Sequence, residues 1–224
     1  MNSYIQNSLN ESTQKVLVNN IYTFVKDPLP EGFDLNYVLN FVRENVPEHL
    51  IYGLESIYIG QFDEIEEKDM DALYKDGAIY TTNKQTDEDD LIDDIIHEIA
   101  HLVEDRLGEY IYNDRTIADE FLGKRRKLHE ILKAEGYTVA IEYIYDLEYN
   151  QGFDEFLYKT VGYDKLTFLT MGLFVSPYGA TSLREYFANA FQHYFLEERE
   201  FVRNTSPALF KKIESLVFQE YEPN

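Results

Sequence analysis

The chain has 224 residues, 44% of them hydrophobic and 15% aromatic, which is enough to bury a substantial core as one domain or two closely packed lobes. Its 42 acidic and 20 basic residues give a formal net charge of −22, which argues against binding nucleic acid or anionic lipid through a general field and favours a basic or neutral partner. The absence of cysteine excludes disulfides, thiolate metal ligands and a cysteine nucleophile.

The first 25 residues lack both a basic start and a continuous apolar block, so they do not have the pattern of a signal peptide. No stretch approaches the roughly 20 apolar residues of a membrane-spanning helix. We therefore expect a cytoplasmic protein with no membrane partner, although a chain without cysteine is compatible with secretion as well.

Two helices are predicted in the N-terminal part, at Ser12–Val25 and Leu35–Asn45, separated by a turn-rich segment at 27–32. Two β-rich runs follow at Glu55–Ile59 and Gly77–Thr82. The second run leads directly into the most informative helix of the chain. In this order a sheet edge borders a cleft, so we expect the 77–82 strand to be able to pair with an extended peptide.

The segment Thr86–Leu107 has the periodicity of an amphipathic helix, and Thr86 and Asp89 have the spacing of a capping box. The predicted apolar face consists of Leu91, Ile92, Ile95, Ile96, Ile99, Leu102 and Val103. The residues that fall off this face are Asp94, His97, Glu98, His101 and Asp105. An apolar side that anchors the helix and a narrow polar stripe are what a metal site in a cleft requires.

Residues 97–101 read HEIAH, an HExxH pattern. Histidines at i and i+4 lie one turn apart, so both rings reach one ion at about 2.0–2.1 Å, while Glu98 sits beside the metal-bound water. The pattern predicts a Zn²⁺ site with His97 and His101 as ligands and Glu98 as general base of a hydrolase. The alternative, a surface helix with solvated histidines, is disfavoured by the strong apolar face. The remaining histidines, His49, His129 and His193, have no ligand-like spacing.

After Gly108 the chain is predicted to be almost wholly helical, with helices at 116–134, 139–149, 154–160, 165–173, 182–200 and 207–221. We therefore predict an α+β fold. Its N-terminal lobe, residues 1–109, carries a small mixed sheet and the HExxH helix. A helical lobe, residues 110–224, completes one catalytic domain with the active site between the lobes. The basic run Lys124–Lys127 is expected to be a solvated helix face rather than a docking surface.

A catalytic zinc needs a third protein ligand and an open position for water. Glu104 and Asp105 lie one turn beyond His101, where they would contact the metal or orient its ligands. Glu120 lies near the position of the third ligand in thermolysin-like enzymes, but its flanking residues do not match. Glu185 begins a strongly apolar helix, although its spacing from Ser182 is also that of a capping box.

Residues 178–191, YGATSLREYFANAF, resemble the second motif of the anthrax lethal factor and Pro-Pro endopeptidase group of zinc metalloproteases, which are of the gluzincin type. In that group a tyrosine precedes a glutamate ligand by seven residues and an E-x-F-A-x-A-F-like helix follows. The resemblance implies a zincin-like fold in which His97, His101 and Glu185 bind zinc. It also implies Glu98 as general base and Tyr178 as the residue that stabilises the oxyanion.

The two motifs cover about a tenth of the chain, and the sequence departs from the family in three respects. Ala100 stands where the family tends to have glycine, and Asn189 stands where it tends to have a second glutamate. The stretch from His101 to Glu185 is also longer than in compact members, as if a helical hairpin were inserted around Tyr110–Tyr149.

The function that the resemblance implies is a zinc-dependent endopeptidase that acts on a peptide or protein substrate. One alternative is a non-catalytic or regulatory protein that keeps the fold as a binding module, and the intact Glu98 argues against it. A second is a regulatory metalloprotease of the phage-repressor-cleaving type, which the helical second motif fits less well.

Overall fold

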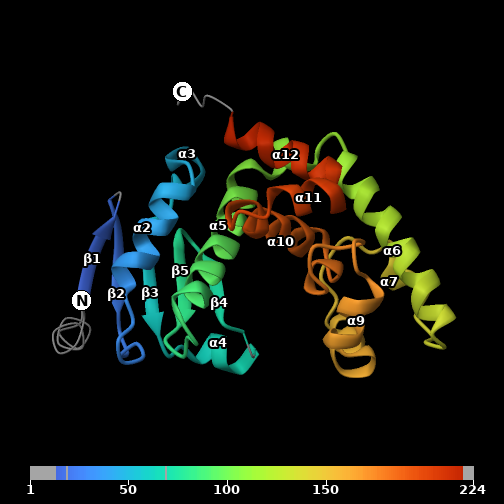
Figure 1. The fold of residues 1–224 in the computed structure, drawn as a ribbon, viewed down its shortest axis with the longest axis horizontal. Coiled ribbons are helices and arrows are strands. Elements are labelled where there is room, and N and C mark those ends of the chain that lie inside the picture. Colours follow the sequence, from blue (N-terminus) through green and yellow to red (C-terminus); the bar gives the residue numbers. More distant parts are fainter. Residues whose placement is uncertain (1–13, 19, 69, 219–224) are drawn as a thin grey trace. The chain divides into compact units, whose positions relative to one another are not determined.

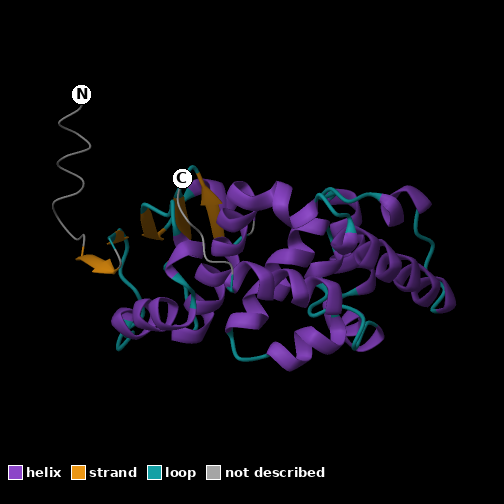
Figure 2. Cartoon of the chain, turned by 90° about the horizontal axis from the view of Figure 1, so that it is seen from above, coloured by secondary structure: helices purple, strands orange, loops and turns teal. Residues whose placement is uncertain are grey.

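The computed structural model describes residues 14–18, 20–68 and 70–218, and its elements are labelled in Figure 1. The chain divides into two compact units between Val103 and Glu104, within helix α5 (Glu88–Tyr112). The sequence predicted this join later, after Glu109. The first unit combines a mixed sheet with helices, as predicted for an α+β fold. Figure 2 shows helices and loops throughout the described part of the second unit.

The described part of the first unit contains one five-stranded sheet with the order β1-β2-β3-β5-β4. The strands β2, β3 and β5 are parallel, and β1 and β4 pair antiparallel to their neighbours at the two edges. Their bounds are β1 (Gln14–Val18), β2 (Ile21–Val25), β3 (Ser56–Gly60), β4 (Ala72–Lys75) and β5 (Ala78–Thr82).

The helix predicted at Ser12–Val25 is wrong over the described residues, which form the β1–β2 hairpin. Burial along β2 alternates, with Ile21 and Thr23 buried and Tyr22 exposed, so the apolar pattern has the period of a strand. Asn20 supplies the left-handed turn residue, at φ 64°. Residues 12, 13 and 19 of the predicted helix lie outside the described part, as do residues 1–13 of the segment considered for a signal peptide.

The strands predicted at Glu55–Ile59 and Gly77–Thr82 are confirmed as β3 and β5, but β4 was not predicted. It joins β5 through Asp76 and Gly77, both with positive φ, as a two-residue Asp-Gly hairpin requires. Because β5 pairs with β3 on one side and β4 on the other, the expectation that the 77–82 strand pairs with a peptide is wrong. The open edge beside it belongs to β4.

The other helices of the first unit are α2 (Leu35–Asn45), with the predicted bounds, α3 (Glu48–Ile51) and α4 (Asp63–Lys68). Figure 1 shows α2 and the first turns of α5 over one face of the sheet. On the other face, in-register Phe24, Tyr58 and Tyr80 stack at centroid distances of 5.1 and 5.2 Å. The sheet therefore has a covered aliphatic face and a partly exposed aromatic face.

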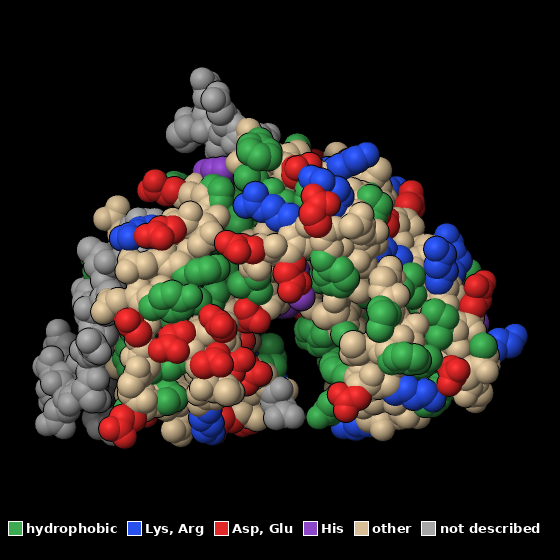
Figure 3. All heavy atoms as spheres, viewed as in Figure 1, with side chains coloured by type: hydrophobic (Ala, Val, Ile, Leu, Met, Phe, Trp, Pro, Cys, Tyr) green, Lys and Arg blue, Asp and Glu red, His purple; other side chains and the backbone are tan. Residues whose placement is uncertain are grey.

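The predicted apolar face of α5 is confirmed, because its seven residues are at most 1% exposed. The N-cap differs by one residue from the prediction. The Asp90 N–H, in the first turn of the helix, donates at 3.1 Å to the side chain of Asp87 and not to that of Thr86. Acidic residues fill this first turn, and Figure 3 shows acidic side chains gathered on the visible face of the first unit. Among the described helices, none combines the length and apolar character needed to cross a membrane.

The second unit is built around α10, which is buried along almost its whole length and packs against α6, α11 and α12. The predicted helix at 182–200 is broken into α10 and α11 near Glu197, which has φ 67°. The elements are α6 (Thr116–Ala134), α7 (Ile141–Tyr145), α8 (Gln151–Glu155), the π-helical η1 (Phe156–Val161), α9 (Tyr163–Leu169), the 3₁₀ turn η2 (Tyr178–Ala180), α10 (Leu183–Phe195), α11 (Arg199–Thr205) and α12 (Pro207–Val217).

The prediction that Lys124–Lys127 form a solvated face is wrong for its first half. Lys124 is 7% and Arg125 is 1% exposed, whereas Arg126 and Lys127 face solvent. The Lys124 ammonium group donates to the carbonyls of Leu173 and Thr205, and burial lowers its pKa to about 8. Hydrogen bonds to backbone carbonyls make the burial of these cations tolerable.

Candidate metal centre

The structure brings together the three polar residues of the HExxH pattern. One ligand atom each of His97, Glu98 and His101 lies within 4.8 Å of the others, close to the spacing at which atoms share one ion. The two imidazole rings lie 5.0 Å apart between centroids at an interplanar angle of 75°. Both histidines are half-buried, so their rings combine a fixed helical position with access for a ligand.

Glu98 is only 5% exposed, although it lies on the polar stripe of α5. Its Oε2 accepts a hydrogen bond of 2.5 Å from the backbone N–H of Tyr74, in the edge strand β4. A carboxylate bound through one oxygen keeps acceptor capacity on the other. The sequence did not reveal this contact, because β4 was not predicted.

Asp94, one turn before Glu98, forms a polar network beneath the motif. Its Oδ2 accepts from Gln85 Nε2 at 2.9 Å and from Thr81 Oγ1 at 3.2 Å. Burial raises the pKa of Asp94 to about 7, and the charges of Asp71 and Glu98 act in the same direction. This network joins the end of β5 to the helix that carries the motif.

Glu185 and Tyr178 belong to the second unit. Ser182 caps α10, because its Oγ accepts from the Glu185 N–H at 3.1 Å. The capping interaction predicted from the spacing of Ser182 and Glu185 is therefore present. It satisfies the backbone N–H of Glu185 and does not involve the Glu185 side chain. Burial raises the pKa of the Tyr178 phenol above its usual range, and the Glu185 and Asp154 carboxylates raise it further. The two predicted residues thus lie near enough to interact electrostatically.

A group of tyrosines around Asp154 was missed by sequence reasoning. Asp154 accepts hydrogen bonds from the hydroxyls of Tyr149, at 2.7 Å, and Tyr163, at 2.9 Å. Glu185 contributes to the raised pKa of both phenols, after burial and Asp154. In a chain with 19 tyrosines, nothing in the sequence singles these two out.

Glu104 is buried and engaged within the second unit. Its side chain is 4% exposed, accepts a hydrogen bond from the Tyr112 hydroxyl and pairs with Arg184 at 3.5 Å. Arg184 immediately precedes Glu185, so this ion pair fixes the start of α10 against the last turns of α5 within the second unit. The adjacent Asp105 is exposed.

Glu120 was the alternative third ligand suggested by the thermolysin-like spacing. Its carboxylate binds the backbone at the start of α12. Its Oε2 accepts from the N–H of Ala208 at 2.8 Å, and its Oε1 accepts from the Leu209 N–H at 3.3 Å and the Tyr186 hydroxyl at 2.8 Å. A carboxylate at a helix N-terminus satisfies otherwise unpaired amides and the helix dipole. This arrangement gives Glu120 a capping role.

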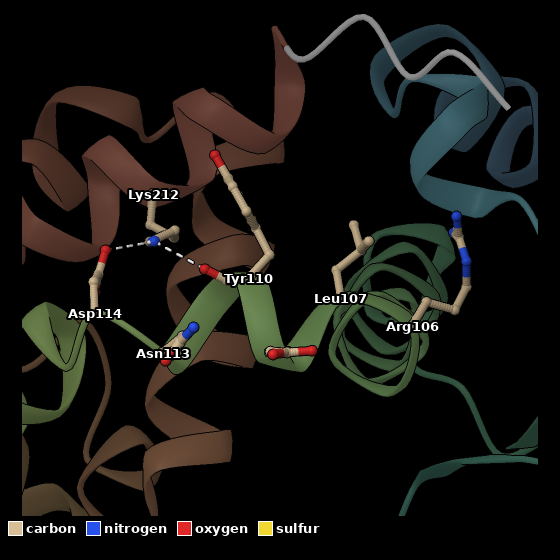
Figure 4. A pocket seen from close by; sticks show the side chains of 7 residues that line it. Arg106, Leu107, Tyr110, Asn113, Asp114 and Lys212 are labelled. Carbon is tan, nitrogen blue, oxygen red and sulfur yellow. Dashed lines mark hydrogen bonds and ion pairs between the residues drawn. The ribbon is translucent and has the colours of Figure 1, made fainter. Parts of the chain in front are cut away.

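Outside these residues, the second unit has a surface pocket of about 670 Å³ along the end of α5 and α12, which Figure 4 shows. Lys212 spans it, donating to Asp114 at 2.8 Å and to the Tyr110 carbonyl at 3.0 Å. None of the predicted site residues lines this pocket. His193 is likewise engaged elsewhere, with Glu198 at 2.5 Å.

The described residues thus provide one group with metal-ligand geometry, the His97-Glu98-His101 cluster on α5. They also place a half-buried glutamate, Glu185, in the first turn of α10 and a half-buried tyrosine, Tyr178, in the preceding 3₁₀ turn η2. Comparison with known protein families, curated proteins and solved structures finds no match to this chain.

Proposed function

We propose that this protein is a zinc-dependent endopeptidase with a zincin-like catalytic domain. The observation that carries the proposal is the clustering of His97, Glu98 and His101 on one helix of a mixed α/β unit. Two imidazole nitrogens and a carboxylate, in a chain without cysteine, form a donor set that suits zinc. In this proposal His97 and His101 are ligands and Glu185 is the third.

A zinc ion held by these residues would supply Lewis acidity to the scissile carbonyl and would lower the pKa of a water molecule. Glu98 is the residue that takes the proton from water and delivers it to the leaving amine, which requires a carboxylate that is fixed but not fully occupied. The single backbone donor at its Oε2 is consistent with that role. Tyr178 is proposed to stabilise the oxyanion of the transition state by donating a hydrogen bond from its phenol.

The choice of Glu185 over Glu120 is supported by what their carboxylates do. Glu120 already binds two backbone amides and a tyrosine hydroxyl. At Glu185 the capping bond of α10 involves the backbone N–H, which donates to Ser182 Oγ, and not the carboxylate. The neighbouring ion pair of Arg184 with the buried Glu104 anchors this turn.

The substrate is proposed to be a peptide or a protein segment in extended form. The open edge is β4, and Tyr74 of this strand contacts Glu98 directly. Because the Tyr74 N–H is already taken by Glu98, we propose that a peptide pairs with the other outward backbone groups of β4 and so runs beside the general base. The acidic surface favours substrates that are neutral or basic.

The test begins with the metal content of protein purified without added zinc, which should be about one equivalent per chain. Incubation with a peptide library, read by mass spectrometry, should yield defined cleavage products. Glu98→Gln should retain zinc and lose cleavage by several orders of magnitude, because an amide cannot accept the proton of water. Glu109→Gln, at an exposed position of the same helix, is the matched control and should behave as wild type.

The possible outcomes separate the alternatives. Zinc bound through His97 and His101 with no cleavage of any library peptide would favour a binding module. Absence of zinc from both wild type and His97→Ala would reject the metal site itself. Cleavage that survives in Glu98→Gln would reject the assignment of the base.

A further inference from the structure

The segment that carries Tyr178 is attached to α10 at its first end. The Ser176 hydroxyl donates to Oδ1 of Asn189, and the Gly179 N–H donates to the Ser176 hydroxyl at 3.3 Å. The same Asn189 donates through Nδ2 to the Glu185 carbonyl at 2.9 Å. One amide side chain, 6% exposed, therefore connects the backbone of Glu185 to the turn before Tyr178.

The turn itself packs directly on the first turns of α10. A Cβ atom placed on Gly179 would lie 3.6 Å from Cβ of Asn189 and 3.7 Å from the Glu185 carbonyl oxygen. A side-chain carbon would make ordinary van der Waals contact at these distances, so the turn lies about one methyl group from the surface of the helix. Tyr178 thus belongs to a turn that lies against the first turns of α10.

The second end of the segment is attached to α6. Arg125 is 1% exposed and donates to the carbonyl of Thr181 at 2.8 Å and to that of Tyr143. The Thr181 hydroxyl donates in turn to the Tyr178 carbonyl at 2.7 Å. The Arg125 guanidinium lies over the rings of Phe121 and Phe153, at 4.8 and 4.4 Å, which fix its plane.

Burying a cation against carbonyls rather than carboxylates is costly, and the Arg125 Nε has no hydrogen-bond partner among the described residues. If this position contributed only to the stability of the core, an apolar side chain of similar volume would be at least as favourable. What Arg125 supplies, and an apolar residue would not, is a planar two-pronged donor that binds one carbonyl of α7 and one at the end of η2.

We propose that Asn189 and Arg125 are positioning residues that clamp the Ser176–Ser182 segment at its two ends and thereby aim the Tyr178 phenol. The inference rests on the proposed function in assigning the phenol to the oxyanion. An oxyanion donor must be held within about 0.5 Å of its working position, and a displacement of about 1 Å lowers the rate by as much as 10²-fold. Asn189 is the residue that departs from the family pattern. In this proposal it acts on Tyr178 indirectly, by accepting the hydrogen bond of the Ser176 hydroxyl.

The kinetic test is a double-mutant cycle between Ser176→Ala and Tyr178→Phe. Ser176 is half-buried and small, so the alanine variant removes the hydroxyl with little loss of packing. It should lower kcat about tenfold with KM and zinc content unchanged. In the Tyr178→Phe background it should have no further effect, because the group that it aims is gone. Ser176→Thr, which keeps the hydroxyl, should restore the rate.

Arg125→Lys tests the other end of the clamp in the same cycle. It keeps the charge and one donor but loses the planar fork, so it should lower kcat in the tyrosine background only. A loss of equal size in both backgrounds, for either variant, would overturn the proposal and assign the residue to general stability.

A second readout does not depend on catalysis. With 3-fluorotyrosine at position 178 alone, the ¹⁹F resonance should be single and narrow in wild type and broadened or divided in Ser176→Ala. The control is the same label at Tyr194, which is buried near the far end of α10 and whose signal should not change. An unchanged signal at 178 would reject the clamp. If wild type cleaves no peptide but the 178 signal responds, the clamp stands and the proposed function fails.

Discussion

The backbone N–H of Tyr74 donates a 2.5 Å hydrogen bond to Oε2 of Glu98 and so joins the edge strand of the sheet to the centre of the HExxH pattern. The two residues meet because β4 runs antiparallel to β5, the strand that leads into α5. In antiparallel pairs the N–H groups of alternate residues point away from the partner strand. The outward amide of Tyr74 therefore serves the helix instead of the ladder.

We predict that Tyr74→Pro lowers kcat of the proposed reaction about tenfold, because it removes the only atom that donates this bond. Proline is tolerated where an edge-strand N–H lies outside the ladder, so the sheet should persist by circular dichroism. Tyr74→Phe keeps the amide and is the matched control. Equal losses in the two variants would show that the side chain matters and not the N–H.

A second pair of variants should distinguish the proposed zinc ligand, Glu185, from the helix-capping residue, Glu120. Glu185→Ala should weaken zinc binding by a hundredfold or more, on the order expected for loss of one of three ligands, measured by competition with a chromogenic chelator. Glu120→Ala should leave zinc affinity unchanged and lower the free energy of unfolding by about 1–3 kcal/mol, because the α12 amides and the Tyr186 hydroxyl lose their acceptor. The reverse pattern would move the third ligand to Glu120.

Tyr178→Phe should lower kcat by roughly 10²–10³ while KM, zinc content and stability stay near those of wild type. The phenol is expected to act as a hydrogen-bond donor, since burial and the Glu185 carboxylate raise its pKa and keep it protonated. Steady-state kinetics with a library-derived peptide measure the effect. Cleavage near the wild-type rate would reduce Tyr178 to a packing residue.

The stability of the metal-free protein should depend on pH through Asp94. Burial raises the pKa of Asp94 from 3.8 to about 7, so between these values the folded state keeps a proton that the unfolded chain has lost. The free energy of unfolding therefore falls as pH rises through this window and levels off above it. Asp94→Asn keeps an acceptor for Gln85 and Thr81 but cannot ionise.

The asparagine variant should accordingly gain stability relative to wild type as pH rises from 4 to 8, by on the order of 2–4 kcal/mol at the upper end. Urea unfolding at several pH values, with a chelator present, measures the difference. A difference that stays constant across the range would show that Asp94 is ionised throughout.

Local sequence determined the elements whose pattern is long and self-consistent. The apolar face of α5 and the bounds of α2 and α6 were predicted because helical periodicity extends over several turns. The same periodicity placed His97, Glu98 and His101 on one side of α5, so their proximity required no tertiary information. The prediction for the N-terminal hairpin was wrong because a short apolar run fits the period of a helix as well as that of a strand. Only pairing with β3 selects the strand.

Only the tertiary structure decided which polar residues have structural partners. No local signal shows that Glu120 caps a helix 88 positions later, or that Arg125 is buried against the carbonyls of Tyr143 and Thr181 while Arg126, its neighbour, faces solvent. The strand that contacts Glu98 was equally hidden, although Asp76-Gly77 marked its turn. Such roles depend on contacts between distant segments, and the free energy of burying a charge is set by the partners that the fold supplies.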